Sequence, residues 1–268
     1  MTLVWLFLIL LVAFCLLVVG DVVRSGGVLR ANLAAYRRGD YHGQLTIIEG
    51  FRTRQFEPAR YLFFRGVACY QLGLLEEAER VLGRSLSLET KPVLKTICRD
   101  QLGLVLLEQG RWDEAAACFR ECIAEEPTRG GGHRGMAEVL LRQGGMDAAA
   151  LEAARLAVGA DRAQNVALGK EAHNLNLSES LAFLAWALAR NSADSGEVES
   201  ALNEAFALCG ETTKPILARL HFCAGHAYAA LGNAAESVRH FQLATGIDPI
   251  GNYGRRARAA VAAVSPSE

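Results

Sequence analysis

The stretch LGLVLLEQGRWDEAAACFRECIAEEP, residues 102–127, decides how this chain folds. Small and large apolar residues recur at helical spacing on both sides of Gly110, so the stretch predicts two helices joined by a turn. Pro127 stands where the second helix should end, because proline cannot continue a helix. A second stretch keeps the same offsets through Gly225, Tyr228, Gly232, Ser237, Phe241, Ala244 and Pro249.

Weaker copies of this pattern return about every 34 residues, which is the signature of a stacked-repeat architecture. The pattern resembles the tetratricopeptide repeat (TPR), whose template is W-x2-L-G-x2-Y, then A-x3-F, then P. The resemblance covers about 225 residues, from Ser25 to Gly251. It implies an all-α superhelical solenoid of about six helix-turn-helix repeats ended by a capping helix. The apolar N-terminus predicts one transmembrane helix in front of these repeats.

The repeat register divides the chain into segments. We predict repeats one to four over 25–163, a linker or extra helical turn over 164–177, and repeats five and six over 178–251. Residues 252–268 form a capping helix and tail, since the last repeat would otherwise expose an apolar face.

Packing between helices explains why the TPR template has particular residue types at fixed positions. Gly103 and Gly225 allow one helix to approach its partner closely. Phe119 and Phe241 are predicted to fill the space between repeats, where burying such a ring contributes roughly 1.5–3 kcal/mol.

The N-terminal segment 1–23 predicts a membrane anchor. No charged residue occurs from Thr2 to Gly20, and a helix of that length spans roughly 28 Å, close to the ~30 Å hydrocarbon core of a bilayer. A cleaved signal peptide is the main alternative, but no basic residue precedes the apolar run. A lipoprotein at Cys15 is a second alternative, which the bulky Phe14 disfavours.

Flanking charges predict the orientation of that anchor. Positive flanks stay in the cytoplasm, so the N-terminus should lie outside and the repeats in the cytoplasm. The seven cysteines are odd in number and show no paired framework, as expected in a reducing compartment. The basic residues that follow the anchor are Arg24, Arg30, Arg37 and Arg38.

The sequence offers no catalytic, cofactor or metal site. The triplet Gly130–Gly132 lacks the strand and the Lys-Ser/Thr of a phosphate loop, and we interpret it as a turn between repeats. Cys98, Cys118 and Cys122 fit the helical core better than a metal site. The net charge of −1 gives no support for nucleic-acid binding.

The partner that we expect is a protein or peptide. In TPR proteins the first helix of each repeat lines the concave surface, and aromatic rings mixed with exposed arginines suit an apolar or acidic peptide. The lysine- and asparagine-rich clamp of chaperone-binding TPRs is absent. The alternative is that the aromatics belong to the inter-helix core. The predicted protein-binding groove residues are Tyr36, Phe63, Tyr70, Arg134, Arg142, Trp186 and Arg190.

Three functional hypotheses follow. The first is a membrane-anchored scaffold or adaptor that holds a protein at the bilayer, similar to bacterial adaptors of envelope biogenesis, although their C-terminal zinc ribbon has no counterpart here. The second is an export-side assembly factor, similar to the six-TPR proteins of pilus assembly. The third is an enzyme, for which the sequence offers no site.

Overall fold

The computed structural model describes residues 26–50, 58–168, 171–209 and 213–264, and within these ranges the chain contains helices and no strand. Residues 26–37 form the first helix. It is followed by α2 (Tyr41–Gly50), α3 (Pro58–Leu72), α4 (Leu75–Leu88), α5 (Pro92–Glu108), α6 (Trp112–Glu125), α7 (Gly130–Gln143), α8 (Asp147–Leu168), α9 (Glu171–Arg190), α10 (Ser195–Cys209), α11 (Lys214–Ala230), α12 (Ala234–Ile247) and α13 (Asn252–Val264).

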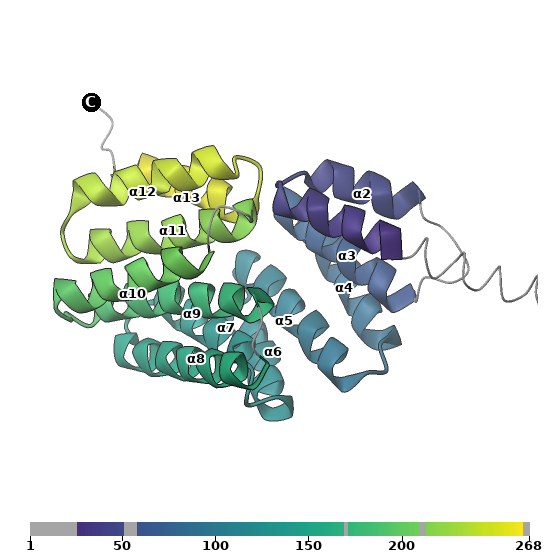
Figure 1. Ribbon diagram of the computed structural model, residues 1–268, viewed down its shortest axis with the longest axis horizontal. Helices are drawn as coiled ribbons and strands as arrows, with labels where there is room; N and C mark the ends of the chain where they lie inside the picture. Colours follow the sequence, from purple (N-terminus) through teal and green to yellow (C-terminus); the bar gives the residue numbers. More distant parts are fainter. Residues whose placement is uncertain (1–25, 51–57, 169–170, 210–212, 265–268) are drawn as a thin grey trace, which may run out of the picture.

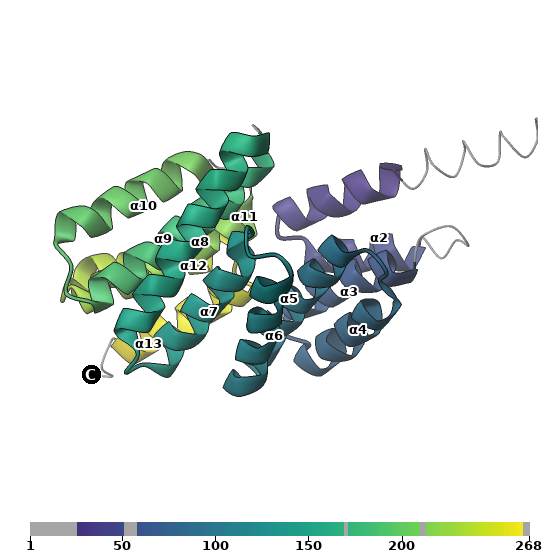
Figure 2. The same ribbon diagram turned by 90° about the horizontal axis from the view of Figure 1, so that it is seen from below.

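Consecutive helices pack as pairs, and each pair stacks on the next. The helices α3 and α4, α5 and α6, and α7 and α8 form such pairs, as do α9 and α10 and α11 and α12. Figures 1 and 2 show the stack curving, so that the C-terminal helices α12 and α13 return beside the N-terminal helices. The predicted all-α solenoid of paired helices is therefore confirmed.

Glycine allows the two helices of a pair to touch. A Cβ atom on Gly103 would lie 2.8 Å from the ring of Phe119, and one on Gly225 would lie 2.5 Å from the ring of Phe241. Both distances are too short for a side chain, so these positions require glycine. Both phenylalanines are fully buried, as the sequence predicts.

The turn inside a pair also depends on glycine. Gly110 has φ +76° and Gly232 has φ +77°, a left-handed conformation that glycine adopts without steric cost. The second helices of these pairs, α6 and α12, end two residues before Pro127 and Pro249 respectively.

Of the two alternatives for residues 164–177, a linker or an extra turn of helix, the described residues follow the helical one. Helix α8 runs on through Leu168, and α9 begins at Glu171. The segment is therefore mostly a continuation of the two repeat helices. Alanine, leucine and glutamate favour helix here, and no proline interrupts it.

The last helix is joined to the first helices, which closes the curve. The Tyr41 hydroxyl of α2 donates a hydrogen bond to the carboxylate of Asp248, which lies between α12 and α13. At the start of α13, Asn252 donates through its side-chain amide to the Tyr70 hydroxyl and through its backbone N–H to Oε1 of Gln71, at 3.1 Å. These contacts join residues 181 to 207 positions apart in the sequence.

The predicted anchor over residues 1–23 lies outside the described residues. Among the helices that are described, none has the length and apolar character needed to cross a bilayer. This finding contradicts the predicted localisation as a single-pass membrane protein. The predicted orientation, with the repeats in the cytoplasm, depended on that localisation and is not supported either.

Candidate functional site

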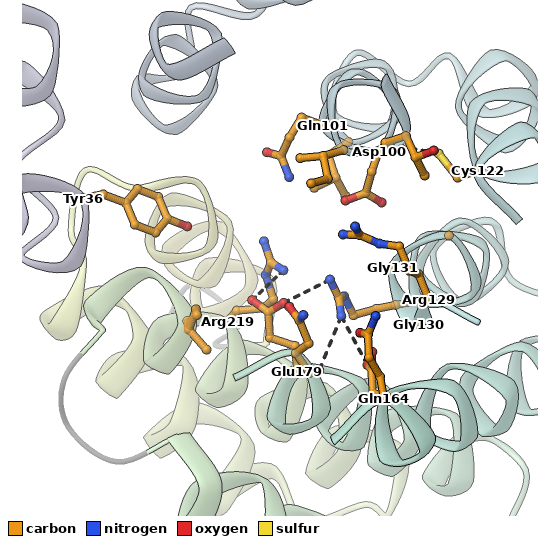
Figure 3. Close-up of a pocket in the computed structure, with 18 of the residues that line it drawn as sticks. Tyr36, Asp100, Gln101, Cys122, Arg129, Gly130, Gly131, Gln164, Glu179 and Arg219 are labelled. Carbon is orange, nitrogen blue, oxygen red and sulfur yellow. Dashed lines mark hydrogen bonds and ion pairs between the residues drawn. The ribbon is translucent and has the colours of Figure 1, made fainter. Parts of the chain in front are cut away.

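A polar cavity of about 240 Å³ lies on the inner side of the curved stack. Figure 3 shows its walls, with Asp100 and Gln101 reaching in from one side, Glu179 and Arg219 from the other, and the start of α7 between them. Side chains from helix 26–37, α3, α5, α7, α8, α9 and α11 contribute to the lining. Its ionisable acidic and basic residues are Asp100, Arg129, Arg134, Asp161, Glu179 and Arg219.

Four of these six groups form one paired cluster. The Glu179 carboxylate lies 2.8 Å from the Arg219 guanidinium and 3.2 Å from that of Arg134. Asp161 accepts a hydrogen bond of 2.7 Å from the Ser180 hydroxyl and lies 3.8 Å from Arg134. Such mutual compensation is what allows buried charges to remain ionised.

Asp100 is different, because no described residue makes a hydrogen bond or ion pair with its carboxylate. Burial raises the pKa of Asp100 above its ordinary value, and attraction to Arg134, Arg129 and Arg219 opposes that rise. The Arg129 guanidinium is also weakly held, since its ion pair with Glu126 has a separation of 3.9 Å. The cavity therefore contains one acid and one base without a close partner inside it.

The glycine triplet Gly130–Gly132 forms the first turn of α7 and part of the cavity wall. A Cβ on Gly130 would lie 2.4 Å from the Asp161 carboxylate, and one on Gly132 would lie 2.9 Å from a side-chain carbon of Ile123. The triplet thus brings the positive end of α7 close to a carboxylate. The sequence interpretation as a turn between repeats missed this role.

An apolar groove of about 230 Å³ adjoins the polar cavity, and Ile97 of α5 lines both. It lies between helix 26–37, α3 and the α4–α5 segment. The rings of Phe63 and Phe64 meet edge to face in its wall, 5.5 Å apart. The groove is lined by Leu29, Arg60, Phe63, Phe64, Glu89, Leu94, Ile97 and Cys98.

The two charged residues of the apolar groove differ in availability. The Glu89 carboxylate accepts hydrogen bonds from the backbone N–H groups of Thr90 and Lys91, at 2.9 and 3.0 Å. Arg60 is exposed, and its guanidinium has no partner among the residues that the structure describes. The groove therefore presents an available positive charge beside an apolar surface.

A second ionic network lies around the buried Glu138. Its carboxylate lies 2.7 Å from Arg256 and 3.6 Å from Arg142, and accepts a 2.9 Å hydrogen bond from the Tyr253 hydroxyl. Burial favours the neutral acid, but Arg256 and Arg142 outweigh burial and hold the pKa of Glu138 below its ordinary value. Glu108 completes the network through a 2.6 Å contact with Arg142.

The predicted groove residues do not form one surface. Tyr36 and Arg134 line the polar cavity, while Phe63 lines the apolar groove. The remaining two aromatics, Tyr70 and Trp186, are buried, so the alternative interpretation as inter-helix core describes them better.

The two remaining predicted arginines make ion pairs with the protein itself. The side chain of Arg142 is only 18% exposed and belongs to the Glu138 network, so its predicted exposure is wrong. Arg190 is more exposed and lies 2.9 Å from Asp147. Neither side chain lines the polar cavity or the apolar groove.

Sequence reasoning missed Asp100, Arg129 and Glu179, and did not single out Arg219. A signal was present in the repeat register, because Asp100 and Arg134 occupy the same slot one repeat length apart. Glu179 and Arg219 share another slot, 40 residues apart. Opposite charges in one slot of successive first helices would have indicated a charged inner wall.

Comparison with known proteins assigns the repeat type. The tetratricopeptide repeat family matches residues 98–129, which span most of α5 and all of α6, and residues 218–250, which span most of α11 and all of α12. No curated protein sequence matches the chain.

Solved structures with similar folds are distant in sequence. The apo form of RapI has a TM-score of 0.53 at 11% identity, over 86% of this chain and 96% of that one. TTC0263, a TPR protein of Thermus thermophilus, gives 0.48 at 20% identity, over 77% and 98%. The Rap conjugation gene regulator of plasmid pLS20, solved with the Phr* peptide, gives 0.49 at 14% identity, over 90% and 76%.

These identities bear on fold alone. The two repeat matches, together with the fold shared with RapI, show that the chain is an all-α TPR solenoid. Such solenoids are typically non-catalytic scaffolds that bind other proteins.

Proposed function

We propose that this TPR solenoid is a protein-interaction scaffold whose apolar groove binds a segment of another protein. The partner segment carries a large apolar side chain next to an acidic residue. The single observation that carries the proposal is an apolar groove on the inner helices whose edge carries Arg60, an arginine with no partner among the described residues.

The lining of the groove supports an apolar anchor. Phe63, Phe64, Leu94 and Ile97 are all only partly buried, so an incoming side chain would remove further apolar surface from water. Such burial contributes about 25 cal/mol per Å². Aromatic residues at the centre of an interface commonly carry much of its binding energy.

The charges at the groove support an acidic residue next to the apolar side chain of the partner segment. Because Glu89 is already engaged by the backbone of its own turn, Arg60 is the available charge at the groove. A carboxylate of the partner can form a bidentate pair with its guanidinium, which adds specificity as well as affinity.

A peptide library displayed against residues 24–268 tests the proposal. We expect selected peptides to be enriched in Leu, Ile or Phe adjacent to Asp or Glu. Affinity for a selected peptide, measured by fluorescence anisotropy, should fall about tenfold or more in Arg60→Glu, since the change replaces attraction by repulsion. Ile97→Ala should weaken binding by removing part of the apolar wall.

Arg84→Glu is the matched control, because Arg84 is also exposed and lies on the outer helix α4, away from the groove. Its affinity should equal that of the wild type. Selected peptides without an acidic residue, or binding that Arg60→Glu leaves intact, would contradict the proposed groove.

A further inference from the structure

The polar cavity is a separate site from the apolar groove, and its charges suggest a different ligand. Within it, Glu179 and Asp161 are matched by Arg134 and Arg219. This pairing leaves Asp100 and Arg129 as the remaining acid and base. Among the described residues, Asp100 has no close partner, and Arg129 is 27% exposed with only a 3.9 Å ion pair to Glu126, so both groups have capacity to bind a ligand.

The two groups come from different elements and face the same space. Asp100 projects from α5, and Arg129 directly precedes α7. Figure 3 shows Asp100 at one side of the cavity with the start of α7 beside it. The first turn of α7 faces the Asp100 carboxylate, since a Cβ on Gly131 would lie at an ordinary contact distance of 3.6 Å from it.

Charge balance selects the class of ligand. A cation would compensate Asp100 and leave Arg129 unmatched, and an anion would do the reverse. A molecule that carries both an ammonium and a carboxylate compensates both groups and adds no net charge to a buried space. The side-chain amides of Gln101 and Gln164 also line the cavity and can both donate and accept hydrogen bonds.

Size limits the ligand further. A volume of about 240 Å³ lies below the roughly 300–1,000 Å³ of pockets for drug-sized molecules. We propose that the polar cavity binds a free α-amino acid, with its ammonium on Asp100 and its carboxylate on Arg129. This binding is additional to the capture of a protein segment in the apolar groove.

Thermal unfolding of the full chain with each of the twenty amino acids tests the proposal. We expect at least one amino acid to raise the unfolding midpoint, by about 5–10 °C at a concentration 100-fold above its Kd. The C-terminal amide and the N-acetyl derivative of that amino acid should each raise it much less, because each lacks one of the two charges.

Variants then assign the contacts. Asp100→Asn and Arg129→Gln should each remove most of the shift. The matched controls are Asp113→Asn and Arg120→Gln, two exposed positions on α6 that should leave the shift unchanged.

The wild-type measurements decide the proposal even if a variant does not fold. It is overturned if none of the twenty amino acids shifts the midpoint, or if the amide or the N-acetyl derivative works as well as the free amino acid. The latter two results would indicate recognition of a peptide end instead. A shift that persists in Asp100→Asn also overturns it.

Discussion

The contact between Gly225 and Phe241 and the contact between Glu138 and Arg256 stabilise the same solenoid in different ways. The first joins the two helices of one pair through shape, and a similar contact recurs at Gly103 and Phe119. The second joins residues 118 positions apart through charge, and it depends on the curvature of the whole stack. Steric contacts that recur along the chain specify how the two helices of a pair pack. Ionic contacts that occur once specify how strongly the stack of pairs curves.

Removing the charge at the centre of the ionic network should have the largest effect. Glu138→Ala leaves the buried arginines Arg142 and Arg256 with Glu108 as their only nearby carboxylate among the described residues. Breaking a buried ion pair costs about 3–5 kcal/mol, and we expect a loss near about 3 kcal/mol in the free energy of unfolding, measured by urea denaturation.

A second test of the ionic network measures how the stability of the milder variant Glu138→Gln depends on pH. Because the folded-state pKa of Glu138 is lowered, its charge stabilises the fold above the unfolded pKa. That contribution is lost as pH falls through the folded value. The stability difference between wild type and Glu138→Gln should therefore be full at pH 7 and shrink below about pH 4.5. An undiminished difference at pH 3 would show that the ionised carboxylate is not the stabilising species.

Adding a methyl group at the steric contact should have a somewhat smaller effect. A Cβ in Gly225→Ala would lie 2.5 Å from the Phe241 ring, which has no room to withdraw because it is fully buried. Overpacking of this kind costs about 1–3 kcal/mol. Retention of wild-type stability in this variant would mean that the helix pair can separate without loss.

Removing one of the hydrogen bonds that close the curve should cost less again. Tyr41→Phe removes the hydroxyl that donates to Asp248 and leaves the shape of the ring unchanged. A hydrogen bond to an acidic group contributes about 1.5–3 kcal/mol, and Asp248 retains the N–H of Gly251 at 3.2 Å. We expect a loss of about 1.5 kcal/mol in the free energy of unfolding, measured by urea denaturation, with the Asn252 contacts to α3 still joining the ends.

The smallest effect should have the opposite sign. Gly159 lies inside α8, and a Cβ there would meet nothing within 4 Å. Gly159→Ala should stabilise the protein by about 0.5–1 kcal/mol, because alanine loses less backbone entropy in a helix. This variant is also the matched control for Gly225→Ala, since both make the same substitution inside a helix.

The sequence predicts best those features that depend on residues close together in the chain. Gly103, Phe119 and Pro127 act within one helix pair, so their spacing predicts both the pair and its packing. The same reasoning placed Tyr36 and Arg134 on the inner face, where they line the polar cavity.

The charged interior could not be predicted in the same way. Arg142 lies on the concave face, where the repeat register predicts an exposed groove residue, and it is covered because α13 returns to supply Arg256. The return of α13 depends on contacts such as Asn252 with Tyr70, which no periodicity encodes. Residues joined by closure of the curve are therefore invisible to repeat-based reasoning.

The hydrogen bond between Tyr41 and Asp248 changes how cooperatively the stack of helices should unfold. A linear repeat protein behaves like a one-dimensional Ising chain, in which end units have one neighbour and fray first. Joining the ends gives the chain a periodic boundary, so the first helix pair, residues 26–37 with α2, and the last helix α13 each gain a neighbour across the join. Amide protons in these terminal helices should then exchange almost as slowly as those of α5 or α9, and unfolding should proceed as one cooperative step.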